Sequence, residues 1–229
     1  MKWLNSYFGR IMKIDIISDT VCPWCFIGKR RLERAIAMRP EMVPEVNWYP
    51  FQLNPEIPEE GIERELYLSL KFGGMERATE IYRAVGEAST SENLDFNLNA
   101  IKRMPNSFKS HRLLHFSKIK GAQQTVAENI FRSYFFHGTD IGSIESLLEI
   151  AKDSGLDPKQ VRYYLESDED LDLVQNQEIQ SRKMGVSGVP CFIVADEYAI
   201  SGAQEPEVFL QVFDAANQLN PEASLHLKI

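Results

Sequence analysis

The residues best suited to chemistry form one tetrapeptide, Cys22-Pro23-Trp24-Cys25. It directly follows a short β-branched segment, residues 13–18, and directly precedes an amphipathic segment that extends to about Arg39. Pro23 suits the first position of a helix, where an N–H group is not needed. Cys22 would then lie at a helix N-terminus, where free amides and the helix dipole favour a thiolate. These positions predict that Cys22 attacks a disulfide and that Cys25, one turn deeper, resolves the mixed disulfide.

A metal site is the main alternative use of such a cysteine pair. A structural zinc site would need a second pair of ligands at finger or ribbon spacing, but the third cysteine, Cys191, has no Cys or His within four residues. His111 and His115 have the spacing of a zinc-protease helix, but Arg112 follows His111 where the catalytic Glu would stand. We therefore expect no metal site. His111 and His115 are expected to be structural, one in the interior and one solvated. Cys191 is expected to lie in the core, because side chains alternate along a strand and its own points opposite to that of Pro190.

Composition restricts the class of protein. The 229 residues are 44% hydrophobic and 25% charged, which is typical of a soluble globular protein, and the formal charge of -8 disfavours nonspecific binding to nucleic acid or anionic membrane. No apolar run reaches the length of a membrane span. Residues 1–12 lack the continuous apolar stretch of a secretory signal, so residues 1–11 are predicted to be an extension. We expect a reducing cytoplasm, where a close cysteine pair is catalytic, redox-sensing or metal-binding.

Hydrophobic periodicity predicts an α/β domain interrupted by helices. Residues 13–18 and 46–51 are typical of strands around one helix, and residues 189–194, 198–200 and 205–218 predict two more strands and a closing helix. Between them, periods near 3.6 predict helices over 62–72, 75–88, 108–120, 123–137, 143–154, 158–166 and 168–184. The expected organisation is a discontinuous domain, 12–54 and 184–220, with an all-helical insertion, 55–183.

This layout, together with Cys22-Pro23-Trp24-Cys25 and Gly188-Val189-Pro190, resembles the thioredoxin superfamily. More narrowly, the chain is similar to the bacterial DsbA-like branch of FrnE type. The segments that carry the similarity are DTVCPWCFIGKRRLE (19–33), FQLNP (51–55), NSFKSHRLLHFSKIKG (106–121) and GVSGVPCFIVADEYAISGAQ (185–204). The resemblance covers about residues 12–218. It implies a thioredoxin fold, β-α-β followed by β-β-α, with a large helical insertion.

The resemblance also implies roles for individual residues. Cys22 would be the nucleophile and Cys25 the resolving thiol. Pro190 would be a cis-proline packed against the pair, and the backbone of Val189 would pair with an extended substrate chain. The dipeptide between the cysteines, Pro23-Trp24, would belong to the same substrate-binding surface.

Two positions depart from the pattern of relatives. Trp24 brings no charge where DsbA carries a histidine, so we expect a less oxidising pair than that of DsbA. Ile16 stands six residues before Cys22, where thioredoxin has a buried carboxylate. Asp15 and Asp19 are nearby, but neither is assigned that role from the sequence.

The expected function is thiol–disulfide oxidoreductase activity, which covers reduction, oxidation or isomerisation of protein or small disulfides. No bound cofactor is expected, although glutathione is a candidate co-substrate. A kappa-class glutathione transferase or 2-hydroxychromene-2-carboxylate isomerase is one alternative, but such enzymes carry Ser where Cys22 stands. A non-catalytic thioredoxin-fold binding module is another. The insertion is expected to form the wall of the site opposite Val189, with Arg112 or Phe116 reaching the site. The sequence specifies no substrate, direction of electron flow, recycling partner or oligomeric state.

Overall fold

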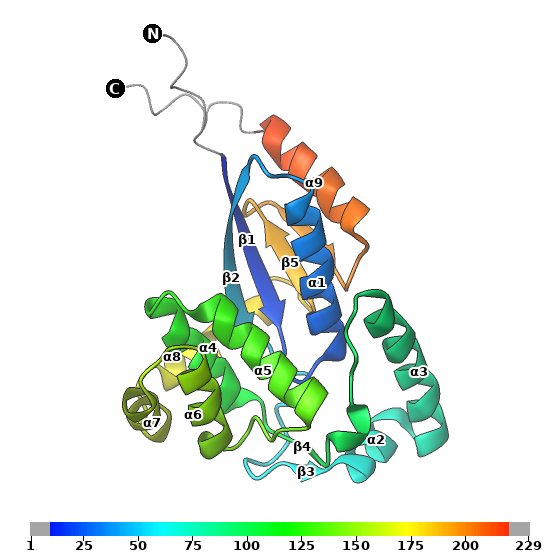
Figure 1. Ribbon diagram of the computed structural model, residues 1–229, viewed down its shortest axis with the longest axis vertical. Coiled ribbons are helices and arrows are strands. Elements are labelled where there is room, and N and C mark those ends of the chain that lie inside the picture. The colour runs from blue at the N-terminus through cyan, green and yellow to red at the C-terminus, as the bar shows by residue number, and fades with distance from the viewer. Residues whose placement is uncertain (1–9, 220–229) are drawn as a thin grey trace.

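The computed structural model describes residues 10–219, and a four-stranded mixed sheet forms its centre (Figure 1). The strand order is β2-β1-β5-β6. The strands are β1 (Arg10–Ser18), β2 (Met42–Pro50), β5 (Cys191–Val194) and β6 (Tyr198–Ser201). β1 pairs in parallel with β2, whereas the β1–β5 and β5–β6 pairs are antiparallel. The predicted extension lies mostly outside the described residues, as does residue 220, and β1 begins two residues before the expected start at Met12.

Helices α1 (Pro23–Ala37) and α9 (Pro206–Leu219) pack together on one face of this sheet (Figure 1). α1 approaches β5 closely because Gly28 has no side chain. A Cβ at this position would lie 3.0 Å from the Phe192 ring and 3.0 Å from Pro190. This close packing fixes the beginning of α1, which carries the two cysteines, against the turn that leads into β5.

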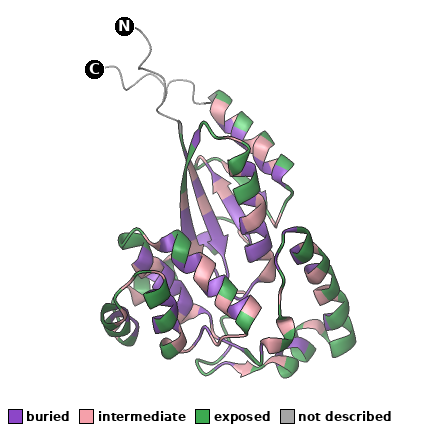
Figure 2. Cartoon of the chain, viewed as in Figure 1, coloured by how far each residue is buried: buried purple, intermediate pink, exposed green. Residues whose placement is uncertain are grey.

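The middle of the chain supplies the remaining helices. They are α2 (Arg64–Phe72), α3 (Met75–Ser91), α4 (Phe108–Ile119), α5 (Gln123–His137), α6 (Ile144–Asp153), α7 (Pro158–Glu166) and α8 (Leu171–Lys183). Figure 1 shows them around the end of the sheet at which β1 finishes, with α2 and α3 on one side and α4 to α8 on the other. The centre of the sheet and the inward helix faces are mostly buried, and the outward helix faces are mostly exposed (Figure 2). The predicted thioredoxin fold with a large helical insertion is confirmed.

The insertion is not wholly helical, and here the sequence prediction was wrong. β3 (Ile62–Glu63) pairs antiparallel with β4 (Arg103–Met104), and a short 3-10 helix, η1, covers Leu98–Ala100. A ladder of two residues is too short to produce the alternation by which strands are recognised. Because Glu63 caps α2 by accepting the N–H groups of Glu65 and Leu66, that helix begins at Arg64 rather than at residue 62.

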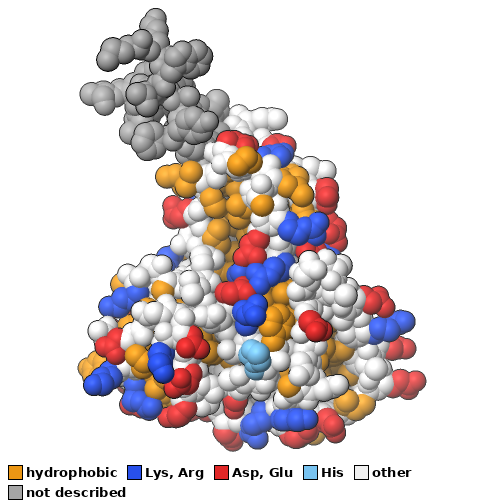
Figure 3. Space-filling view, viewed as in Figure 1, with side chains coloured by type: hydrophobic (Ala, Val, Ile, Leu, Met, Phe, Trp, Pro, Cys, Tyr) orange, Lys and Arg blue, Asp and Glu red, His pale blue; other side chains and the backbone are white. Residues whose placement is uncertain are grey.

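Ion pairs join the insertion to α1. Lys29 lies 2.7 Å from Glu128 of α5, and Arg31 lies 3.0 Å from Glu92, which follows α3 and is almost wholly buried. Elsewhere on the face shown in Figure 3, acidic and basic side chains are interspersed. Within residues 10–219, no helix has the length and apolar character needed to cross a membrane.

Candidate active site

Cys22 occupies the N-cap position of α1, as the sequence predicts. Its N–H donates to the Asp19 carbonyl at 3.0 Å, and the N–H of Cys25 donates to the Cys22 carbonyl at 3.1 Å. Pro23 stands at the start of the helix, and the first turn contains no acidic residue. The positive end of the helix dipole therefore acts on Cys22 without a neighbouring carboxylate in that turn.

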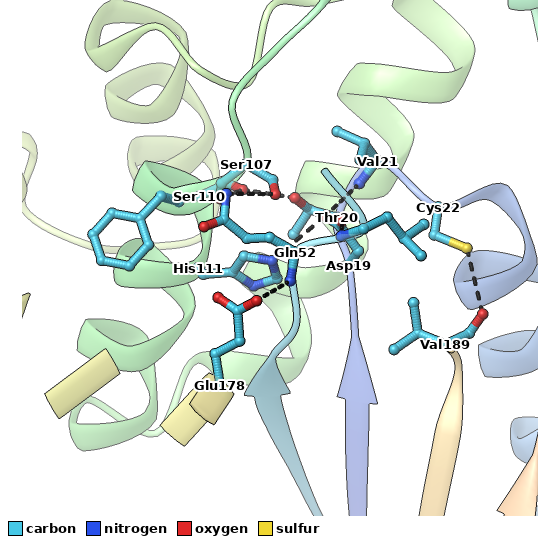
Figure 4. Close-up of polar contacts among 12 residues, drawn as sticks. Asp19, Thr20, Val21, Cys22, Gln52, Ser107, Ser110, His111, Glu178 and Val189 are labelled. Atoms are coloured by element: carbon cyan, nitrogen blue, oxygen red, sulfur yellow. Dashed lines mark hydrogen bonds and ion pairs between the residues drawn. The ribbon is translucent and has the colours of Figure 1, made fainter. Parts of the chain in front are cut away.

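The turn before β5 lies directly against Cys22. The Val189-Pro190 peptide bond is cis, and the Cys22 thiol donates to the Val189 carbonyl at 3.7 Å (Figure 4). Among the described residues, the Val189 N–H has no hydrogen-bond partner. Pro23 and Trp24 are half-buried beside the cysteines. The structure thus brings all six residues assigned to the site from the sequence into one region.

The two cysteines are both buried and are not joined in a disulfide. Cys22 is 3% exposed, and Cys25 is 0% exposed. Burial raises the pKa of the Cys25 thiol, and the neighbouring Cys22 raises it further, whereas the Ser18 hydroxyl and the Asp19 backbone lower it. Cys25 is therefore held as a thiol inside the core, while Cys22 lies at the helix end.

Buried polar contacts join the turn at residues 19–22 (the redox turn) to helix α4 (Figure 4). The Asp19 carboxylate accepts the Leu53 N–H at 2.7 Å, and its other oxygen lies 3.5 Å from His111 Nε2. The Thr20 and Ser110 hydroxyls are 2.7 Å apart. These contacts hold the residues that precede Cys22 against the insertion. Sequence reasoning left Asp19 unassigned and gave His111 no link to the cysteines; the spacing of Asp19, three residues before Cys22, was the available signal.

The two histidines of α4 have separate partners. His111 is buried against Asp19, whereas His115 is half-buried with Nε2 3.5 Å from Asp170. Burial lowers the pKa of His115, and Asp170 opposes this effect. Residues 10–219 contain no group of three His, Cys, Asp or Glu side chains that could hold a metal ion.

The expectation that Arg112 and Phe116 reach the site was wrong. The Arg112 guanidinium donates to the carbonyls of Tyr164, Leu165, Ser167 and Glu169. The Phe116 ring packs on the Tyr164 ring at a centroid distance of 5.0 Å. Successive helix residues point about 100° apart, so His111 faces the redox turn while Arg112 holds the end of α7.

Cys191 lies in a separate part of the core. It is 6% exposed and packs with Ile17 and Phe51, in a different cluster from Cys22 and Cys25. Burial raises the pKa of its thiol. A cavity of about 830 Å³ lies near this part of the sheet, between α8 and strands β1, β5 and β6, and neither Cys22 nor Cys25 lines it.

Comparison with known proteins agrees with this geometry. The family described as "DSBA-like thioredoxin domain" matches residues 13–214. The chain belongs to this DsbA-like family. A solved structure, the probable DsbA oxidoreductase SCO1869 from Streptomyces coelicolor, is 31% identical with a TM-score of 0.81, and the match covers 90% of this chain and 89% of that one. The uncharacterized protein YwbO of Bacillus subtilis (strain 168) is 27% identical over 198 residues, 86% of this chain and 92% of that protein.

A solved structure with lower sequence identity shows only that the fold is shared. The cytosolic disulfide reductase DsbM from Pseudomonas aeruginosa is 13% identical with a TM-score of 0.63. The match covers 90% of this DsbA-like chain and 99% of DsbM.

Proposed function

We propose that this DsbA-like protein is a thiol–disulfide oxidoreductase in which Cys22 attacks and Cys25 resolves. The observation that carries the proposal is the free Cys22 thiol at the N-terminus of α1, placed against the cis Val189-Pro190 turn with Cys25 one helical turn deeper. The Cys22 thiolate attacks a substrate disulfide, and one substrate sulfur leaves as a thiolate. Cys25 then attacks Cys22, which releases the second substrate sulfur. Two electrons pass to the substrate, and the protein is left with a Cys22–Cys25 disulfide.

The unpaired Val189 N–H supports extended peptide as one class of substrate. A strand laid along this turn can accept that N–H and present its disulfide to Cys22 (Figure 4). Half-buried Pro23 and Trp24 form the other side of this surface. Small disulfides need only the thiol and remain substrates under the same proposal.

We propose that the pair works in the reducing or isomerising direction, in a cytoplasm, as a member of the FrnE-type branch. The side chains between the cysteines carry no charge, which disfavours strongly oxidising behaviour. The distant fold relative DsbM is named a cytosolic disulfide reductase, and another structure of it is described as containing GSH. Glutathione is accordingly the proposed reductant: two molecules reduce the Cys22–Cys25 disulfide and leave as glutathione disulfide.

The variant Cys25→Ala tests the proposed roles. Without the resolving thiol, Cys22 should remain bound to its substrate, so mass spectrometry should find one glutathione or one peptide attached at Cys22 after incubation with the corresponding disulfide. Turnover that requires both thiols should cease. Cys191→Ala is the matched control and should retain turnover, because Cys191 packs in a different cluster.

Two outcomes would contradict the proposal. Glutathione-dependent turnover of an electrophile that persists in Cys25→Ala would favour the transferase or isomerase alternative. Peptide binding that is unchanged after both thiols are alkylated, in the absence of any disulfide exchange, would favour the binding module.

A further inference from the structure

The resolving thiol must carry negative charge in an apolar place. Cys25 is 0% exposed and belongs to the same buried cluster as Ile14 and Ile16 of β1. In either direction of disulfide exchange, its sulfur is a thiolate while the bond to Cys22 forms or breaks. A charge in such surroundings is costly unless hydrogen-bond donors are directed at it. The residues around Cys25 therefore decide how readily this step occurs.

Two donors at the end of β1 act on this thiol. Burial raises the pKa of the Cys25 thiol, and the Ser18 hydroxyl and the Asp19 backbone both lower it. Ser18 is 2% exposed, and its hydroxyl has no hydrogen-bond partner in the described part of the chain, so it is free to donate to a thiolate. Side chains alternate along a strand, so Ser18 shares the face of Ile14 and Ile16. Its free hydroxyl therefore points toward the cluster that holds Cys25.

We propose that the Ser18 hydroxyl and the Asp19 amide form a two-donor site that stabilises Cys25 as a thiolate. The inference rests on the proposed function, in which Cys25 is the resolving thiol. Contacts of the Asp19 side chain with Leu53 and His111 fix its backbone in place. Ile16 offers no polar group at the position of the thioredoxin carboxylate. The Ser18 hydroxyl, two residues further along β1, donates a hydrogen bond to the Cys25 thiolate. The thioredoxin carboxylate instead accepts the proton of the resolving thiol.

The site acts on one step of the exchange. The Cys25 proton passes to solvent as the thiolate forms. This thiolate attacks Cys22 Sγ in the mixed disulfide, the Cys22–Cys25 bond forms, and the bond from Cys22 to the substrate sulfur breaks. The electron pair leaves with the substrate sulfur, which is released as a thiolate and takes a proton from solvent when its pKa requires it. The first attack, by Cys22, does not involve Ser18.

The experiment separates the two steps with the aromatic disulfide dithionitrobenzoate, whose released thiolate is coloured. Fully reduced protein, in a Cys191→Ala background, should release one equivalent when Cys22 attacks and a second when Cys25 resolves. Ser18→Ala should slow the second release about 10- to 100-fold, the effect of losing one hydrogen bond to a charged group, and leave the first release unchanged. The pH profile of the second release should move to higher pH, and Ser18→Thr, which keeps the hydroxyl, should restore it.

Ser110→Ala is the matched control, because Ser110 is also buried and bonds Thr20 and Ser107 rather than a cysteine. A second release in Ser18→Ala within about twofold of that in Ser110→Ala, with an unshifted pH profile, would overturn the inference while the two releases still supported the proposed function. Absence of the first release in the Cys191→Ala parent would instead overturn the proposed function itself.

Discussion

The variant Cys22→Ser should reduce insulin disulfides no faster than the buffer blank. Serine keeps the size of the side chain but has no ionised form near neutral pH, so no nucleophile remains at the N-terminus of α1. Cys25 cannot substitute for it, since its side chain is wholly buried and burial raises the pKa of its thiol. The measurement is the rate of insulin precipitation with dithiothreitol or glutathione as the electron source.

Folding of this variant is checked separately. In the described part of the chain the Cys22 side chain makes one hydrogen bond, a weak one to the Val189 carbonyl at 3.7 Å. Because serine is close to cysteine in size, thermal unfolding of Cys22→Ser should stay close to that of the parent. Cys191→Ala serves as the control for loss of a buried sulfur away from the turn. Turnover by folded Cys22→Ser that exceeds turnover by the double variant Cys22→Ser/Cys25→Ala would show that another group attacks the disulfide.

The variant Arg112→Met should cause a large loss of stability. Arg112 is 3% exposed, and its guanidinium satisfies four carbonyls around the end of α7. A buried acceptor without a partner costs about 1–3 kcal/mol. Two of the four carbonyls are part-buried, and water can replace the guanidinium there. The other two would lose their partner, so the expected loss is about 3–5 kcal/mol of unfolding free energy. Denaturant titration measures it. The specific activity of the protein that remains folded should not change, because Arg112 lies away from Cys22.

Arg132→Ala provides the comparison on a neighbouring helix. Its side chain is half exposed, with a long contact of 3.9 Å to Glu128 and a cation–π contact with Phe136. Removing it should cost at most about 1 kcal/mol. If Arg112→Met lost less than about 1 kcal/mol, or lost insulin reduction while still folded, the placement of Arg112 at the end of α7 would not describe its role.

Local patterns were sufficient to predict most of the fold. Periodicity located α4, α5 and α7 to within one residue, and a glycine or a proline marks one end of each of these helices. The pairing of β3 with β4 was missed because two residues on each strand leave no pattern. Strand and helix positions around Cys22-Pro23-Trp24-Cys25 also placed both thiols correctly, since a cap and its first helical turn depend on neighbouring residues.

The contacts of the site that come from distant segments could not be predicted in the same way. Asp19 and His111 are 92 positions apart in the sequence. No local signal specifies that α4 packs on the redox turn. The same limitation explains the wrong expectation for Arg112, whose partners lie in α7 and the residues that follow it. Ser18 belongs to no motif, and only its burial and its lack of a hydrogen-bond partner distinguish it from other serines.

The redox equilibrium of the Cys22–Cys25 pair is the measurement that tests the account most directly. The protein would be equilibrated in glutathione buffers of graded potential, quenched with an alkylating agent and analysed as peptides by mass spectrometry. We expect one reversible two-electron transition, at a potential clearly below the value of about -120 mV for DsbA and nearer the value of about -270 mV for thioredoxin. A pair that never closes, or a Cys22 that accumulates as a stable glutathione adduct, would contradict the dithiol mechanism.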